Sequence, residues 1–213
     1  YATAPESLTF PIPDGVDDGT ALALLLQGLT AWHLYATCAR VQPGESVVVI
    51  SGAGGAGALA LQLGKAFKAG RVIATASTPE KRDLCLQLGA DVALDASAEN
   101  LGERILEANH GERVDAVFEM AGGRVFEECM GALAPFGRMV AYGIASNEQN
   151  ELATGRLMRR SHAVIGFWLM HCLGRPAMVD EALHGLFGQV AAGELRAVVG
   201  ATYPLADAAQ AQI

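Results

Sequence analysis

Short apolar runs alternate along most of the chain with longer segments in which apolar residues recur every three or four positions. The clearest run covers residues 47–50, four consecutive β-branched residues of the kind found in strands buried on both faces. After a glycine-rich turn, Leu59, Leu63 and Phe67 fall on one face of a helix. This alternation predicts a parallel sheet with helices on both of its faces.

The same pattern predicts six strands in all. They cover residues 47–50, 71–76, 92–94, 114–120, 137–142 and 163–167. The expected helices cover residues 21–40, with a break near Gly28, then 55–68, 79–89, 98–109, 123–133 and 177–192, before a last extended segment at 197–203. Because crossovers between parallel strands are right-handed, we expect an α/β doubly wound parallel sheet, a Rossmann fold, with the strand order 3-2-1-4-5-6.

The turn after the first strand is a candidate phosphate-binding site. It comprises Gly52, Ala53, Gly54, Gly55, Ala56 and Gly57, and its first, third and last residues form the pattern G-x-G-x-x-G. Such a turn between a strand and a helix binds a dinucleotide pyrophosphate, because glycine allows the phosphate and the helix to approach closely. The alternative is an ordinary glycine-rich turn of an α/β protein.

Composition and charge narrow the possible partners. The chain has 213 residues, 51% of them apolar, and a net charge of −8 without a basic run, so we expect no nucleic-acid partner. The longest uninterrupted apolar stretch, residues 21–26, is too short to span a bilayer, so we expect no membrane partner either. Four widely separated cysteines without a C-x-x-C pair indicate reduced thiols and a cytoplasmic location.

Longer phrases of the sequence carry a family resemblance. They are Gln-Gly-Leu-Thr-Ala-Trp-His at 27–33, Val-Gln-Pro-Gly-Glu at 41–45, the glycine turn, Leu-Gly-Ala-Asp at 88–91, Gly-Arg-Met-Val at 137–140 and Tyr-Pro-Leu-Ala-Asp-Ala-Ala at 203–209. With these phrases the chain resembles the medium-chain dehydrogenase/reductase superfamily, specifically its zinc-independent quinone oxidoreductase branch, the ζ-crystallin-like enzymes.

The resemblance also implies a domain organisation. Because the sequence starts at Tyr1 and stops at Ile213 without an evident cap, we interpret it as a fragment of a longer protein. Residues 1–18 are then the tail of an N-terminal GroES-like catalytic domain, residues 19–200 the NADP-binding Rossmann domain, and residues 201–213 the start of a C-terminal return segment.

The end of the second strand bears on the choice of cofactor. NAD-binding folds usually place an acid there for the ribose hydroxyl, whereas this chain has no acid before Glu80. By resemblance, Ser77 and Lys81 occupy the positions that bind the 2′-phosphate, which favours NADPH. The alternative is a solvated Lys81 balanced by Glu80 and Asp83. One departure from the family counts against the phosphate role, since Ala96 stands where the family often has a tyrosine.

Other cofactor contacts are implied by the resemblance and by position at strand ends. Thr30, near Gln27, is expected beside the cofactor phosphates or the nicotinamide, with a helix-packing role as the alternative. Four residues follow the fifth and sixth strands and are expected to wall the nicotinamide, with ordinary core packing as the alternative. These are Gly143, Ile144, Phe167 and Leu169. We expect His33 and Glu119 to be structural, and the catalytic residues stay unassigned.

Zinc is not expected. Zinc-dependent alcohol dehydrogenases of the superfamily carry a ligand cysteine just before the Gly-x-Thr phrase, and here that position is Leu26, whose side chain cannot bind a metal.

The sequence therefore predicts the NADPH-binding domain of a quinone oxidoreductase-like enzyme, which transfers hydride from NADPH to a quinone or an α,β-unsaturated carbonyl. The alternatives are the cofactor domain of a zinc-dependent alcohol dehydrogenase, or an NADPH-binding protein without turnover. We expect the fragment alone to be inactive. We also expect a homodimer that forms through the edge strand Ala163–Phe167.

Overall fold

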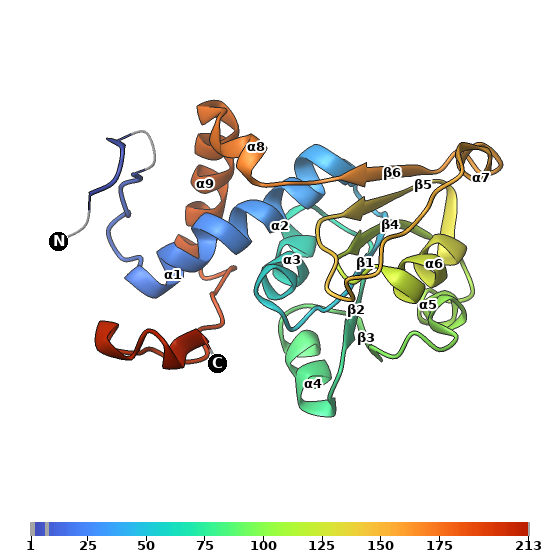
Figure 1. Cartoon of the computed structure of the whole chain (residues 1–213), viewed down its shortest axis with the longest axis horizontal. Helices are drawn as coiled ribbons and strands as arrows, with labels where there is room; N and C mark the ends of the chain where they lie inside the picture. Colours follow the sequence, from blue (N-terminus) through green and yellow to red (C-terminus); the bar gives the residue numbers. More distant parts are fainter. Residues whose placement is uncertain (1–2, 7–8, 213) are drawn as a thin grey trace.

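The protein is built around one parallel sheet, seen in the computed structural model, which describes residues 3–6 and 9–212 (Figure 1). The strands are β1 (Ser46–Val49), β2 (Arg71–Ala76), β3 (Val92–Asp95), β4 (Val114–Glu119), β5 (Leu133–Ala141) and β6 (Ala163–Gly166). All neighbouring strands are parallel, and their order in space is β3-β2-β1-β4-β5-β6. The predicted doubly wound fold and its strand order are confirmed.

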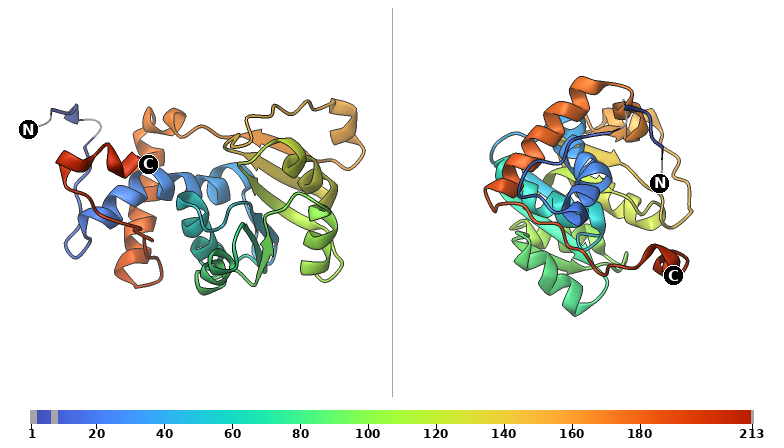
Figure 2. Two further views of the ribbon diagram at one scale, coloured as in Figure 1. Left: turned by 60° about the horizontal axis from the view of Figure 1, so that its bottom comes forward. Right: turned by 90° about the vertical axis from the view of Figure 1, so that its left-hand side faces the viewer.

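Helices connect the strands and cover both faces of the sheet (Figure 2). They are α3 (Gly55–Ala66), α4 (Pro79–Gln87), α5 (Leu101–Ala108), α6 (Gly123–Ala132), α7 (Thr154–Met158), α8 (Met170–Leu173) and α9 (Pro176–Ala191). Two 3₁₀ turns, η4 (Leu205–Asp207) and η5 (Gln210–Gln212), follow near the end of the chain. Residues 197–203 lead into these turns and form no strand.

Two hydrophobic cores lie on the two faces of the sheet. Along β1, Val47 and Val49 point into the core shared with α3 and α9, whereas Val48 points into the core shared with α5 and α6. This period of two is the geometry of a strand, and all three valines are fully buried. The continuous apolar run in the sequence therefore reflects burial on both faces, as parallel sheets require.

The first helix runs without interruption from Asp18 to Ala39 as α1 (Asp18–Ala23), η2 (Leu24–Gly28), α2 (Leu29–His33) and η3 (Leu34–Ala39), where η2 and η3 are π-helical. The predicted break near Gly28 is wrong, since this residue has helical dihedral angles. A Cβ atom at Gly28 would lie 3.2 Å from Cδ1 of Leu186 in α9. The glycine therefore serves the close approach of two helices.

An 18-residue window of this 22-residue helix has a mean hydropathy of 1.2, so by length and composition the helix could cross a bilayer. The length of the longest uninterrupted apolar stretch does not reveal this property of the helix, because polar residues such as Gln27 interrupt its apolar positions. In the fold, most of its buried apolar residues belong to the core that also contains residues of α3 and α9. A core helix of a globular domain has the same properties, and the absence of a membrane partner stays a prediction.

Two further differences concern the second half of the sheet. Strand β5 begins at Leu133, four residues before the predicted start, and pairs irregularly there, with Val114 opposite Leu133 before regular pairing resumes at Ala116 and Arg138. The short helices α7 and α8, which flank β6, were not predicted.

Candidate functional site: the carboxyl ends of the strands

The glycine turn lies at the carboxyl end of β1 and is anchored to the end of β2. The backbone N–H of Ser51 donates to Oγ1 of Thr75 at 3.1 Å, and the N–H of Gly52 donates to the Thr75 carbonyl at 2.8 Å. Thr75 is fully buried, and Ser51 has a φ of 59°, in the left-handed region. The turn is therefore held in shape by hydrogen bonds before any ligand binds.

The spacing of the glycines has a steric cause. A Cβ atom on Gly57 would lie 2.3 Å from the carbonyl oxygen of Ser51, and one on Gly52 would lie 2.9 Å from Cβ of Ala74. Gly54 precedes the first residue of α3 and has no side chain to cap it, so N–H groups of the first helical turn are available to an anion. This cradle fits a pyrophosphate group.

A small cavity connects the glycine turn to the start of α4. It has a volume of about 190 Å³ and is lined by Ser51, Ala53, Gly54, Ala76, Ser77, Lys81 and Ala96. Its lining contains one cation and no carboxylate, and the alanine at position 96 leaves room that a larger side chain would fill.

The ion pairs around this cavity leave Lys81 available. Arg82, the next residue, is paired with Asp95 at 2.9 Å. In the part of the chain that the structure describes, no carboxylate lies within 4.0 Å of the Lys81 ammonium group. Glu80 and Asp83, which the alternative interpretation pairs with Lys81, therefore form no direct ion pair with it. Thr78 caps α4, since its hydroxyl accepts from the Lys81 N–H at 3.3 Å, and Pro79 is the first helical residue, as the sequence predicts.

The first helix contacts the glycine turn through Gln27. A Cβ atom on Gly55 would lie 2.9 Å from Cγ of Gln27. The hydroxyl of Thr30 donates to the carbonyl of Leu26 at 2.8 Å, within its own helix. The hydroxyl of Thr30 is thus already satisfied within the helix, and its place beside the cofactor stays a prediction.

A second, more open cavity of about 450 Å³ lies at the ends of β5 and β6. It is lined by Ala141, Tyr142, Gly143, Ile144, Gly166, Phe167, Trp168 and His171. It brings together three of the four predicted nicotinamide contacts. The fourth, Leu169, points into the hydrophobic core and is only 9% exposed. Tyr142 and His171 were not assigned to this site, and the only signal for them was that they follow strands.

Glu119 and His33, which lie near this second cavity, make structural contacts. Oε1 of Glu119 accepts from the N–H groups of Ala121 and Gly122 at 2.6 and 2.8 Å, and burial of the carboxyl raises its pKa. Nδ1 of His33 lies 2.8 Å from Oγ1 of Thr37, and burial lowers the pKa of the imidazole. Nε2 of His33 is buried without a partner among the described residues, so the structural role of this residue stays a prediction, as does that of Glu119.

The described part of the chain contains no group of three or more His, Cys, Asp and Glu residues that could hold a metal ion. Leu26, at the position expected for a ligand cysteine, has an apolar side chain that is 58% exposed.

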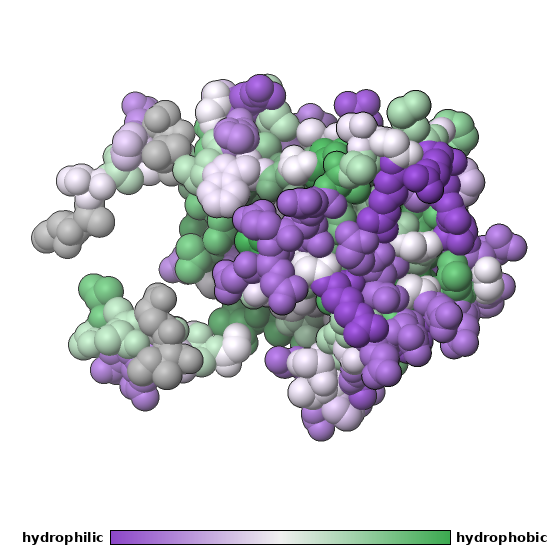
Figure 3. Space-filling view, turned by 45° about the vertical axis from the view of Figure 1, so that its right-hand side comes forward, coloured by the Kyte–Doolittle hydropathy of each residue, from purple (hydrophilic) through white to green (hydrophobic). Residues whose placement is uncertain are grey.

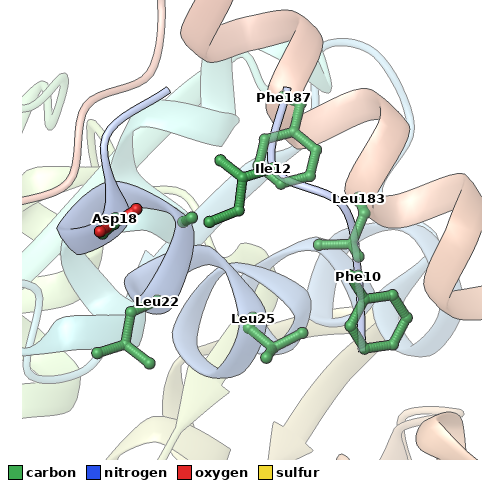
Figure 4. Close-up of a pocket in the computed structure, with 8 residues that line it drawn as sticks. Phe10, Ile12, Asp18, Leu22, Leu25, Leu183 and Phe187 are labelled. Carbon is green, nitrogen blue, oxygen red and sulfur yellow. The ribbon is translucent and has the colours of Figure 1, made fainter. Parts of the chain in front are cut away.

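A third cavity is apolar and lies away from the strand ends. It has a volume of about 350 Å³ and forms between the N-terminal segment, the first helix and α9 (Figure 4). Its lining includes Phe10 and Ile12 of the N-terminal segment and Leu183 and Phe187 of α9, and Asp18 contributes the single carboxylate. No set of polar groups converges there, so the strand ends remain the better candidate site. Hydrophobic residues also gather on the surface where the two terminal segments project (Figure 3).

Comparison with known proteins agrees with this geometry. The sequence profile of the zinc-binding dehydrogenase family matches residues 55–186. A quinone oxidoreductase of Pseudomonas aeruginosa is 32% identical to this chain, and the match covers 94% of this chain and 62% of that protein. A 2-haloacrylate reductase of a Burkholderia species is 31% identical, and the match covers 92% of this chain and 59% of that protein. The quinone oxidoreductase of Thermus thermophilus, whose structure has been solved alone and with NADPH, is 40% identical, with a TM-score of 0.82 over 95% of this chain and 64% of that protein. The chain thus spans about three fifths of these proteins.

Proposed function

Because the chain belongs to the zinc-binding dehydrogenase family, in the quinone oxidoreductase-like branch of the medium-chain dehydrogenase/reductase superfamily, we propose that it is the NADPH-binding part of an oxidoreductase. The reaction is hydride transfer from NADPH to a small electron-poor acceptor, a quinone or an α,β-unsaturated carbonyl. Related proteins with such names, and the solved NADPH complex of one of them, support this assignment.

The observation that carries the proposal is the cavity between the glycine turn and Lys81. The turn offers backbone N–H groups to the pyrophosphate, and Ser77 and Lys81 offer a hydroxyl and an ammonium group in the lining of the same cavity. A carboxylate that would hold the ribose hydroxyl of NAD is missing from the cavity lining. The charge pattern therefore favours the 2′-phosphate of NADPH over NAD.

At the other end of the cofactor, the chain supplies a wall for the nicotinamide. NADPH, when bound, supplies the hydride. Gly143 leaves room at the end of β5, and Ile144 and Phe167 present apolar surface that excludes water from one face of the ring. A quinone or enone delocalises the incoming negative charge, so the reaction requires neither a zinc ion nor a strong protein acid.

The test is a titration of the 213-residue chain with NADPH and with NADH, followed by tryptophan fluorescence. We expect tighter binding of NADPH in the wild type and a loss of about tenfold in NADPH affinity for Lys81→Ala, because a charge-assisted contact to phosphate is worth roughly 1.5–3 kcal/mol. Lys65→Ala, which removes an exposed lysine of α3, is the matched control and should leave both affinities unchanged. Equal affinity of the wild type for the two cofactors would contradict the proposal.

We also propose that two copies of the chain form a homodimer through strand β6. This strand is the last in the sheet order, and its residues 163–165 are half-buried and apolar. An apolar edge strand favours pairing with a second copy. Light scattering at micromolar concentration should give the mass of a dimer, and a monomer would contradict this part of the proposal. The cytoplasmic location stays a prediction, in keeping with the four free cysteines.

A further inference from the structure

A cavity at the opposite end of the sheet is lined by arginines. It has a volume of about 280 Å³ and lies between the last turn of α6 and the segment that leads from α7 into β6. Its lining consists of Met130, Gly131, Arg156, Arg159, Arg160 and His162. Since α7 and α8 flank β6 at opposite ends, this cavity is separated from Phe167 by the length of that strand (Figure 1).

The positive charge in this cavity is only partly balanced. Arg156 pairs with Glu127 at 2.5 Å. Nearby, Arg113 donates to the carbonyl oxygens of Gly131 and Leu133, so it satisfies the carboxyl end of α6. Arg159 and Arg160 have no carboxylate within 4.0 Å among residues 3–6 and 9–212.

The sequence around these arginines explains the lack of partners. Residues 152–179 contain no Asp or Glu, although the whole chain carries a net charge of −8. The positive charge is therefore a local feature of this segment, and no acidic residue within the segment balances it.

His162 also lines the cavity. Its two ring nitrogens are shielded from solvent and make no well-formed hydrogen bond among the described residues, while the backbone of Leu133 and Ala134 lies close to the ring. The ring therefore forms part of the cavity wall, and the charged donors of the cavity are the guanidinium groups.

The backbone that carries these side chains is anchored. The carbonyl of Arg160 accepts from the N–H of Phe136 at 3.0 Å, and the N–H of His162 donates to the carbonyl of Leu157 at 3.0 Å. The segment is thus tied both to β5 and to α7, so a ligand has to order the two exposed arginine side chains but not the backbone beneath them.

We propose that this cavity binds a compact oxyanion of the phosphate class, held by the guanidinium groups of Arg159 and Arg160, with the His162 ring in the cavity wall beside it. Two guanidinium groups match the two negative charges of a phosphate, and their planar donor sets suit its oxygen atoms. The volume accommodates a phosphate group with several waters, at about 30 Å³ for each water.

The test is calorimetric titration of the 213-residue chain with inorganic phosphate at low ionic strength. Because phosphate can also enter the cofactor site, all variants are made in a Lys81→Ala background. We expect Arg159→Gln/Arg160→Gln to weaken phosphate binding by at least about tenfold. Arg175→Gln is the matched control, since Arg175 is also exposed, lies in the same acid-free stretch and flanks the other end of β6.

Two further measurements fix the location and the chemistry. Phosphate should shift the NMR signals of the His162 ring, and acetate, with a single charge, should bind at least about tenfold more weakly. Unchanged phosphate affinity in the double variant, or an unshifted His162, would overturn the proposal, and equal affinity for acetate would overturn the phosphate class. NADPH binding by chains that retain Lys81 should not change with the arginine substitutions, so this result is independent of the proposed function.

Discussion

The two ends of the candidate cofactor cleft are built in different ways. At the glycine turn, the contacts come from backbone groups that Thr75 and the packing of Gly57 fix in position. At the ends of β5 and β6, the contacts come from side chains that stand in the open, with Ile144 38% and Trp168 65% exposed. The first end is complete within this chain, whereas the second offers only one wall.

The sheet topology explains why both cavities lie at the same edge of the sheet, beyond the carboxyl ends of the strands. Strand β1 is paired with β2 on one side and with β4 on the other, so the connections that follow β1 and β4 run to opposite sides of the sheet. Ligands of such sheets bind at this switch point, outside the carboxyl ends of the strands. The two ends are therefore expected to contact different parts of the same cofactor, and substitutions at each end can be tested separately.

The largest expected effect concerns the open end. We expect the 213-residue chain to bind NADPH but to oxidise it with 1,4-benzoquinone only at the background rate, because one exposed wall cannot hold an acceptor beside the nicotinamide. Positioning of this kind can account for roughly 7–11 kcal/mol of the barrier. The measurement is the absorbance at 340 nm with and without protein.

Turnover well above background would mean that the open wall is sufficient and that the contrast between the two ends is wrong. If turnover above background is found, a chelator added to the same assay separates the two enzyme hypotheses. Loss of that turnover with the chelator would favour the zinc-dependent alcohol dehydrogenase.

The next effect concerns the closed end. Gly57→Ala places a Cβ atom 2.3 Å from a backbone oxygen, so the turn must shift, and we expect NADPH affinity to fall by about a hundredfold as several phosphate contacts are lost. Gly55→Ala should have a smaller effect, because its Cβ would meet only the flexible side chain of Gln27. The measurement is the dissociation constant by fluorescence titration, with circular dichroism to show that each variant folds.

Gly188→Ala is the control for replacing a helical glycine. A Cβ there meets no atom within 4 Å, so it should leave NADPH binding unchanged and stabilise α9 by roughly 0.5–1 kcal/mol. Normal binding by a folded Gly57→Ala variant would show that the pyrophosphate lies elsewhere.

The contrast also explains which features could be predicted from the sequence. Strand β2 and the Thr78 cap were predicted correctly because each depends on neighbouring residues alone. The break at Gly28 was wrong because a glycine that weakens a helix and a glycine that admits α9 look the same in sequence. Leu169 illustrates the same limit at a strand end, where periodicity does not separate a core residue from a cavity wall.

Features that join distant segments had no local signal. The sequence predicts that β5 begins at residue 137, whereas Leu133 already pairs with Val114 on the neighbouring strand. The arginine cavity joins α6 to the segment 156–162, and no motif in either piece indicates that they meet.

The smallest expected effect concerns Glu119, the buried carboxyl at the open end. Burial raises its pKa in the folded protein, so between the ordinary value and the raised value the folded state binds more protons than the unfolded state. The free energy of unfolding should therefore fall as the pH rises through this window. Glu119→Gln keeps an oxygen that can accept from the N–H groups of Ala121 and Gly122, and it removes the titration. We expect urea unfolding of the variant, measured at several pH values above 4.5, to lack this decline. Parallel profiles for the wild type and the variant would show that Glu119 does not ionise in a buried position, and that the open end is wetter than its contacts indicate.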